Sequence, residues 1–191
     1  MFSTPLFASY SYDGDVNIND KTLTKMKEMG DELFTKTGVS TAIVAKEYMD
    51  KNGFLEVKDR YLKELDAPYV LWIFSKKYDK RDSVGINQMF SSKDLEGKFD
   101  KDSMFSPFGG SFTKLIVIQK SKSDPTAAAF LNGYADLTDM LAESHGVKLK
   151  SSIGSETRAT MDIARVLMYL TFFAIFIWYL KVKFFNKEKN V

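Results

Sequence analysis

The sequence predicts a small α/β domain followed by a single C-terminal transmembrane helix. Amphipathic helical patterns alternate with short β-branched runs along most of the chain, an order that builds layered α/β structures. The chain has 191 residues and is 45% hydrophobic, which is enough for one core and an anchor but not for two full domains. The run Val166–Leu180 (VLMYLTFFAIFIWYL) is apolar around the whole helix instead of along one stripe.

Composition narrows the classes of function. Lys and Arg number 27 against 25 Asp and Glu, so the chain lacks the strongly basic surface of nucleic-acid-binding proteins, and we expect no nucleic-acid partner. The absence of cysteine excludes disulfides, thiolate nucleophiles and zinc sites with Cys ligands. It does not indicate the compartment, because a cysteine-free chain suits reducing and oxidising surroundings alike.

The first helix has clear start and stop signals. Asn19 or Asp20 can cap its N-terminus, and Thr22–Thr37 repeats apolar residues at helical spacing. Gly38 is the residue expected just after the last turn. The run Val39–Ala45 that follows is apolar and β-branched, and it predicts a buried strand.

A second helix and strand follow in the same order. Beyond an expected turn at Asn52-Gly53, residues from Phe54 to Leu65 keep a helical period. Pro68 breaks this pattern, and the apolar run Tyr69–Phe74 predicts the second strand.

The remainder of the domain has weaker signals. A charged turn at Ser75–Asp82 leads to Ser83–Met89, which we predict as an antiparallel strand, so the order up to this point is α-β-α-β-β. After a loop rich in Ser, Gly and Phe, residue propensity favours a strand at Leu115–Ile118. Asp124 as a cap and Pro125 in the first turn then begin a helix that ends at Gly146 and should cover the sheet.

The apolar C-terminal run is slightly short for a membrane span, and its charged neighbours complete it. A hydrocarbon core of about 30 Å needs about 20 helical residues. Arg165 at one end and Lys181 and Lys183 at the other can extend their charges to the headgroups, which lengthens the span to Ile163–Phe185. A buried core helix is the alternative, but such helices usually keep a polar stripe. The residues assigned to the membrane anchor are Arg165, Phe172, Phe173, Phe176, Trp178, Tyr179, Lys181 and Lys183.

Flanking charge predicts the orientation of this helix. More lysines follow the span than basic residues precede it, so the positive-inside rule places the C-terminus in the cytoplasm and the domain in the periplasm. Met1–Tyr10, however, lacks the basic region of an export signal. Either Met1 lies inside or after a longer signal peptide, or the protein is tail-anchored with a cytoplasmic domain. Thr4–Ser9 favours the first hypothesis, because it resembles the small-residue end of a cleavable signal.

These patterns divide the chain into five parts. Residues 1–15 are an extended N-terminal segment and a candidate signal-peptide remnant, and 16–147 form the α/β domain. Residues 148–161 are a polar linker, 162–185 the transmembrane helix, and 186–191 a short basic cytoplasmic tail.

Several short motifs of the domain resemble those of the TPM domain family. They are Val16–Asp20 ahead of the first helix, Thr37-Gly38-Val39 at its exit, the strand Tyr69–Phe74, and the charged hairpin Tyr78–Arg81 leading to Gly85. The resemblance covers Val16–Glu143. Members of the family include thylakoid phosphatase-like and photosystem-repair proteins, and bacterial envelope proteins with a similar C-terminal span.

The resemblance implies a three-layer α-β-α domain facing the periplasm or lumen. In the family, some members hold a divalent cation such as Ca²⁺, some are credited with phosphatase activity, and others act in interaction or assembly. This chain departs from the pattern where Gly85 is followed by Ile86–Met89 instead of a glycine and an acidic residue. Asp15 and Asp20 remain as candidate cation ligands, but Ca²⁺ needs several oxygens at once.

No catalytic residues are assigned from the sequence. The stretch that begins at Asp13 starts like an EF-hand loop, but Ile18 stands where that loop needs glycine and Thr24 where it needs glutamate. The single histidine, His145, lies near the end of the last domain helix, where a capping or an exposed role is expected.

Three functions follow as hypotheses. The first is a membrane-anchored interaction, assembly or accessory module of a membrane protein complex, with the lipid bilayer and other envelope proteins as partners. The second is a membrane-anchored phosphatase dependent on a divalent metal, which would activate a bound water. The third is a tail-anchored cytoplasmic adaptor.

Overall fold

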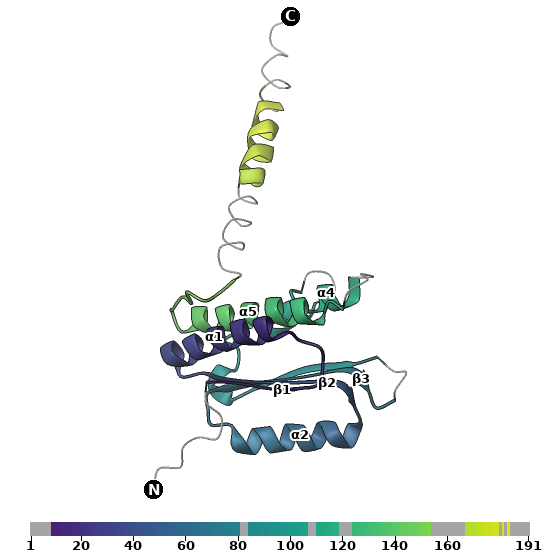
Figure 1. Cartoon of the computed structure of the whole chain (residues 1–191). Helices are drawn as coiled ribbons and strands as arrows, with labels where there is room; N and C mark the ends of the chain where they lie inside the picture. The colour runs from purple at the N-terminus through teal and green to yellow at the C-terminus, as the bar shows by residue number, and fades with distance from the viewer. Residues whose placement is uncertain are drawn as a thin grey trace, which may run out of the picture. The chain divides into compact units, whose positions relative to one another are not determined.

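The computed structural model describes residues 9–80, 84–106, 110–118, 124–153, 167–179, 181 and 183. The chain divides into two compact units, Met1–Ile153 and Gly154–Val191. The first unit is an α/β domain in which helices cover both faces of a four-stranded mixed sheet (Figure 1).

The sheet contains three parallel strands and one antiparallel strand. The strands are β1 (Tyr10–Gly14), β2 (Ser40–Met49), β3 (Tyr69–Tyr78) and β4 (Ile86–Ser91), and they lie in the order β1-β2-β3-β4. In the parallel part, Ile43 of β2 is opposite Tyr12 of β1 and Trp72 of β3. The fourth strand, β4, runs antiparallel to β3, as the sequence predicts.

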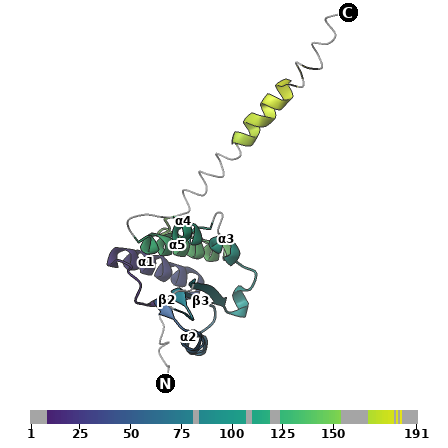
Figure 2. The same cartoon turned by 90° about the vertical axis from the view of Figure 1, so that its right-hand side faces the viewer.

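The helices form two layers around this sheet. They are α1 (Asp20–Thr37), α2 (Lys51–Glu64), the short α3 (Lys101–Phe105) and α4 (Thr113–Ile118), and α5 (Thr126–Ser144), with a 3-10 turn at Lys93–Leu95. Figure 2 shows α1, α3, α4 and α5 on one side of the sheet and α2 on the other. The described part of the chain therefore has the α-β-α layering that the family resemblance implies.

The larger core lies between the sheet and the α1/α5 layer. Its centre is Trp72, whose ring lies 4.8 Å from Phe112 and 5.1 Å from Phe130, measured between centroids. The indole N–H of Trp72 donates to Asn87 Oδ1 at 2.6 Å, so the buried polar atom is satisfied. A smaller core on the other face packs α2 through Phe54 and Tyr61.

The predicted first helix is confirmed together with its caps. The Asn19 side chain accepts a hydrogen bond from Thr22 N at 2.9 Å, which satisfies one of the free donors of the first turn. Gly38 ends the helix in the left-handed conformation with φ of 75°, where a side chain would be strained.

The structure adds a strand that the sequence did not predict and corrects a turn. β1 lies inside the range predicted as an extended N-terminal segment, and it pairs with β2 along its whole length. The expected turn at Asn52-Gly53 was wrong, because both residues lie in the first turn of α2. Asp50 caps this helix by accepting from Gly53 N at 2.6 Å.

The strand predicted at Leu115–Ile118 was wrong, since these residues belong to α4. Two neighbours account for the difference. Phe112, which precedes α4, is only 2% exposed and packs against Trp72, and its carbonyl oxygen accepts from Leu115 N and Ile116 N. The place beside β3 is already taken by β4, so packing overrides the β-propensity of the apolar run.

The first half of the predicted linker belongs to the domain. Leu149 is buried in the α1/α5 core, and residues 150–152 are hydrogen-bonded to side chains of α1 and α5. Residues 154–161 of that linker lie outside the described residues, as do residues 1–8 of the candidate signal remnant 1–15 and the tail 186–191.

The second unit contains a helix at residues 167–179, in which every residue is exposed. Within the described ranges, no helix combines the length and the apolar character needed to cross a membrane. The predicted span Ile163–Phe185 extends beyond these ranges, and residues 163–166, 180, 182, 184 and 185 are not described. Among the assigned anchor residues, Arg165 is in this undescribed part.

Candidate functional site

Charged side chains gather where the three parallel strands end. Ligands of open α/β sheets bind at the carboxyl ends of parallel strands, so this edge is where a site is expected. Asp13, Lys46, Glu47 and Lys76 all lie there. Successive side chains of a strand point to opposite faces, and this alternation separates the charges into two groups.

The group on the α2 face is an ion-pair cluster. Asp13 binds Lys46 Nζ at 2.7 Å and the Arg60 guanidinium at 3.3 Å, and Tyr61 Oη lies 3.5 Å from the same carboxylate. The hydrogen bond from Lys46 lowers the pKa of Asp13 below its usual value, against the effect of burial. These contacts join β1, β2 and α2, which indicates a structural role.

The group on the α1/α5 face centres on Lys76. Its ammonium donates to Glu47 Oε1 and Asp124 Oδ2, each at 2.8 Å. Burial acts to lower the pKa of Lys76, but the hydrogen bonds to the two carboxylates outweigh it and the pKa is raised. The bond from Lys76, together with donors from Thr126, lowers the pKa of Asp124 to about 2. Lys76 and Asp124 are therefore both charged at neutral pH.

A cleft of about 410 Å³ opens beside Lys76, between β3, β4, α4 and the start of α5. Its apolar lining comes from Phe74, Val84, Ile86, Phe112, Ile116 and Pro125. The exposed fraction of these apolar side chains ranges from 2% at Phe112 to 90% at Val84. The cleft thus joins an apolar floor to a charged wall, and its volume lies within the range of about 300–1,000 Å³ typical of ligand pockets.

Of the two residues predicted as metal ligands, one accepts a backbone hydrogen bond and the other is exposed. Asp15 Oδ1 accepts a hydrogen bond from Glu47 N at 2.7 Å, just beyond the end of β1. Asp20 is exposed in the first turn of α1. Across the described ranges, no group of three or more His, Cys, Asp or Glu side chains is arranged to hold a metal ion. The binding of a divalent cation such as Ca²⁺ by Asp15 and Asp20 stays a prediction.

The histidine lies at the end of α5. His145 Nδ1 is 2.8 Å from the carbonyl oxygen of Leu141, one of the free acceptors of the last turn. This position agrees with the predicted capping role.

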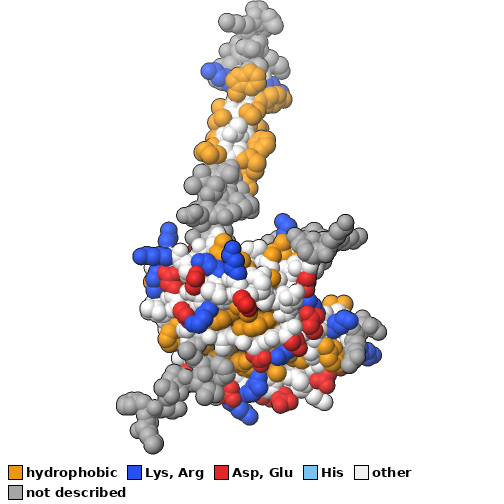
Figure 3. All heavy atoms as spheres, in the orientation of Figure 1, with side chains coloured by type: hydrophobic (Ala, Val, Ile, Leu, Met, Phe, Trp, Pro, Cys, Tyr) orange, Lys and Arg blue, Asp and Glu red, His pale blue; other side chains and the backbone are white. Residues whose placement is uncertain are grey.

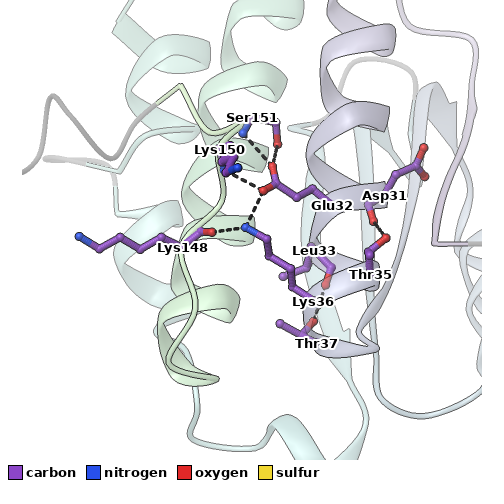
Figure 4. Close-up of polar contacts among 9 residues, drawn as sticks. All are labelled: Asp31, Glu32, Leu33, Thr35, Lys36, Thr37, Lys148, Lys150 and Ser151. Carbon is purple, nitrogen blue, oxygen red and sulfur yellow. Dashed lines mark hydrogen bonds and ion pairs between the residues drawn. The ribbon is translucent and has the colours of Figure 1, made fainter.

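A second polar cluster ties the end of the domain to α1 (Figure 4). Glu32 accepts hydrogen bonds from Lys150 N and from Ser151 N, both at 2.8 Å, and from Ser151 Oγ at 2.6 Å. Its fourth donor is Lys36 Nζ at 2.7 Å, which also donates to the carbonyl oxygen of Lys148. Burial acts to raise the pKa of Glu32, but these donors outweigh it and lower the pKa to about 2. We call this cluster the Glu32 clamp.

Scans against protein-family models, curated proteins and solved structures each found no match to this chain. No relative therefore supplies a function, a substrate or a partner.

Sequence reasoning missed the cleft and the Glu32 clamp. Lys76 was assigned to a charged turn, whereas β3 continues through it to Tyr78, and Asp124 was assigned only as a helix cap. One signal was available: Glu47 and Lys76 each follow the buried part of a predicted strand, and parallel strands end at one edge. For the Glu32 clamp there was no local signal, because Glu32 and Lys150 are 118 positions apart.

Proposed function

We propose that this chain is a membrane-anchored interaction or assembly module, acting as an accessory subunit of a membrane protein complex. One observation carries the proposal. Every residue of the helix at 167–179 is exposed, and Figure 3 shows hydrophobic side chains along the face of this helix that is in view. Its large apolar and aromatic side chains are Leu167, Met168, Tyr169, Leu170, Phe172, Phe173, Ile175, Phe176, Ile177, Trp178 and Tyr179.

Such a helix is unfavourable in water. Burying one large apolar side chain is worth about 1.5–3 kcal/mol, so a lipid or protein environment around this helix would stabilise it substantially. A continuous helix over Ile163–Phe185 would be about 35 Å long, enough for a hydrocarbon core of about 30 Å. A bilayer is thus the environment that fits the helix on all sides.

The proposed orientation places the domain in the periplasm and the C-terminus in the cytoplasm. The lysines after the span support it through the positive-inside rule. The resemblance to the TPM family supports the same side, and an interaction role for the domain.

The pairing of charges in the domain favours interaction over catalysis. Asp13, Glu32 and Asp124 are each saturated by donors, and their pKa values are lowered, whereas a general acid or base at neutral pH needs a pKa near 7. These carboxylates are suited to holding structure and presenting charge.

Membrane attachment is tested with the full chain and a double substitution in the exposed helix. We expect the native protein to stay with membranes after alkaline carbonate extraction, and Phe173→Glu with Ile177→Glu to move it to the soluble fraction, because two charges in the span are costly. Lys63→Glu, on the exposed surface of α2, is the matched control and should not change the partition. Release of the native chain by carbonate would contradict the proposal.

A further inference from the structure

We infer that the free edge of β4 pairs with an extended strand of a partner protein, and that this strand places an apolar side chain in the cleft beside Lys76. The inference rests on the proposed interaction role, and it names the surface and the kind of partner. It is carried by the unpaired outer backbone of β4 and by the apolar cleft that opens next to this strand.

The outer edge of β4 lacks a backbone partner. β4 is the last strand of the sheet, and it pairs with β3 residue for residue, without a bulge. Across the described part of the chain, the backbone of residues 86–91 forms no hydrogen bond with any segment other than β3. The outward N–H and C=O groups of an edge strand alternate along it, so their partial charges are complementary to those of another strand.

β4 also lacks the features that usually keep an edge strand unpaired. Its sequence, INQMFS, contains no charged residue and no proline, and six residues is a common length for a paired strand. The opposite edge of the sheet, β1, carries Asp13, whose carboxylate binds Lys46 and Arg60. Because a charged side chain on an edge disfavours a further strand, β4 is the edge suited to pairing.

The cleft provides a place for one side chain of the added strand. Phe74 and Asn87 are opposite each other in the β3–β4 ladder, and both line the cleft, which therefore lies on the face where these side chains point. Every second side chain of a strand beside β4 would be directed to this same face. The cleft is lined mainly by apolar side chains, and Lys76 and Asp124 in its lining already pair with each other, so an uncharged apolar side chain fits it.

A second copy of β4 cannot supply that side chain. The residues of β4 that point to the face of the cleft are Asn87, Met89 and Ser91. Asn87 accepts the hydrogen bond from Trp72, and Met89 is buried in the core of its own domain. Pairing of β4 with itself would leave the cleft unfilled, which favours a strand from a different protein.

The test uses the full chain in detergent and the labelled peptide fluorescein-Thr-Leu-Thr-Phe-Thr-Leu-Thr, with binding measured by fluorescence anisotropy. Two control peptides have the same side chains but carry N-methyl groups, one on the backbone nitrogens of its threonines and the other on those of Leu and Phe. Alternate residues of a strand direct their N–H groups to the same side. We therefore expect one methylated peptide to bind at least tenfold more weakly, and the other to bind like the unmodified peptide.

Hydrogen exchange and three variants locate the binding. The peptide should slow amide exchange in β4 and leave β1 unchanged. Ile116→Asn removes apolar surface from the cleft and should weaken the peptide at least tenfold. Val84→Ser should act in the same direction at a side chain that is 90% exposed, where a substitution does not disturb the fold. Leu55→Ser, on the exposed surface of α2, is the control and should bind like the native chain.

No binding of the peptide, equal binding of the two methylated peptides, or slowed exchange at β1 instead of β4 would each overturn the inference. Protection of β4 without peptide, together with a dimer mass in light scattering, would also overturn it, because a second copy would then occupy the edge. These outcomes are separable from failure of the proposed function. If the native chain stays in carbonate-washed membranes while the peptide fails to bind, the anchor stands and the edge of β4 is not the contact.

Discussion

The carboxylate of Glu32 on α1 links two segments that lie far apart in the sequence. Four donors surround it, and three of them come from positions 118 or 119 residues away. Hydrogen bonds to a charged group contribute about 1.5–3 kcal/mol, roughly twice a neutral bond. The Glu32 clamp therefore holds residues 148–151 against α1.

The Glu32 clamp predicts a pH-dependent stability. Because the pKa of Glu32 falls from 4.5 to about 2 on folding, its contribution is complete above pH 4.5 and is lost as the pH drops toward about 2. We expect Glu32→Gln to lower the free energy of unfolding by about 1–3 kcal/mol at pH 7, and by much less near pH 2. Urea unfolding at both pH values measures this difference.

Glu28→Gln is the matched control, since Glu28 is an exposed residue of the same helix and forms an ion pair with Lys25, three positions before it. It should change stability by less than about 0.5 kcal/mol, as exposed pairs do. A penalty for Glu32→Gln that is the same at pH 7 and pH 2 would show that the charge of Glu32 is not responsible.

At the scale of elements, α4 depends on what surrounds it. Its short sequence has the composition of a strand, and with only six residues it is too short to be stable by itself. Phe112 connects it to the core, with centroid distances of 4.8 Å to Trp72 and 5.1 Å to Phe130. The aromatic cluster thus holds α4 and α5 on β3, and with them one wall of the cleft.

We expect Phe112→Ala to destabilise the domain by about 3–5 kcal/mol, because it leaves a cavity among packed rings. Thermal unfolding followed by circular dichroism measures the change. Phe34→Ala removes a ring of the same size that is 40% exposed on α1, and it should cost much less. Equal losses for the two variants would contradict the importance of the cluster.

At the scale of the whole molecule, two units with different surfaces share one chain. The domain has two cores of its own, whereas the described helix at 167–179 exposes all of its side chains. This difference between the two units is the physical basis of the proposed anchor.

The proposed orientation predicts which side of the membrane exposes the domain. We expect trypsin added to intact spheroplasts to digest the domain, because its surface lysines, such as Lys58 and Lys63, would face the periplasm. A cytoplasmic marker protein should remain intact in the same sample. If trypsin digests the domain in inverted membrane vesicles but not in intact spheroplasts, the domain lies in the cytoplasm, as the tail-anchored hypothesis requires.

The sequence by itself determined the elements whose signals are local. The Asn19 cap, the Gly38 end, the run Tyr69–Phe74 and the helix after Pro125 were all predicted, because capping and periodicity act within a few residues.

Only the tertiary structure decided the features that depend on distant partners. β1 is a strand because β2 lies beside it, α4 is a helix because Phe112 packs under it, and Lys76 meets Asp124 across 48 positions. A short segment with mixed propensity takes the conformation that its neighbours stabilise, and ion pairs form wherever the fold brings opposite charges together. The cleft and the Glu32 clamp are both products of such contacts. Strand order points to the sheet edge where Lys76 lies, but the partners of Lys76 and of Glu32 are too distant in the sequence to be predicted from it.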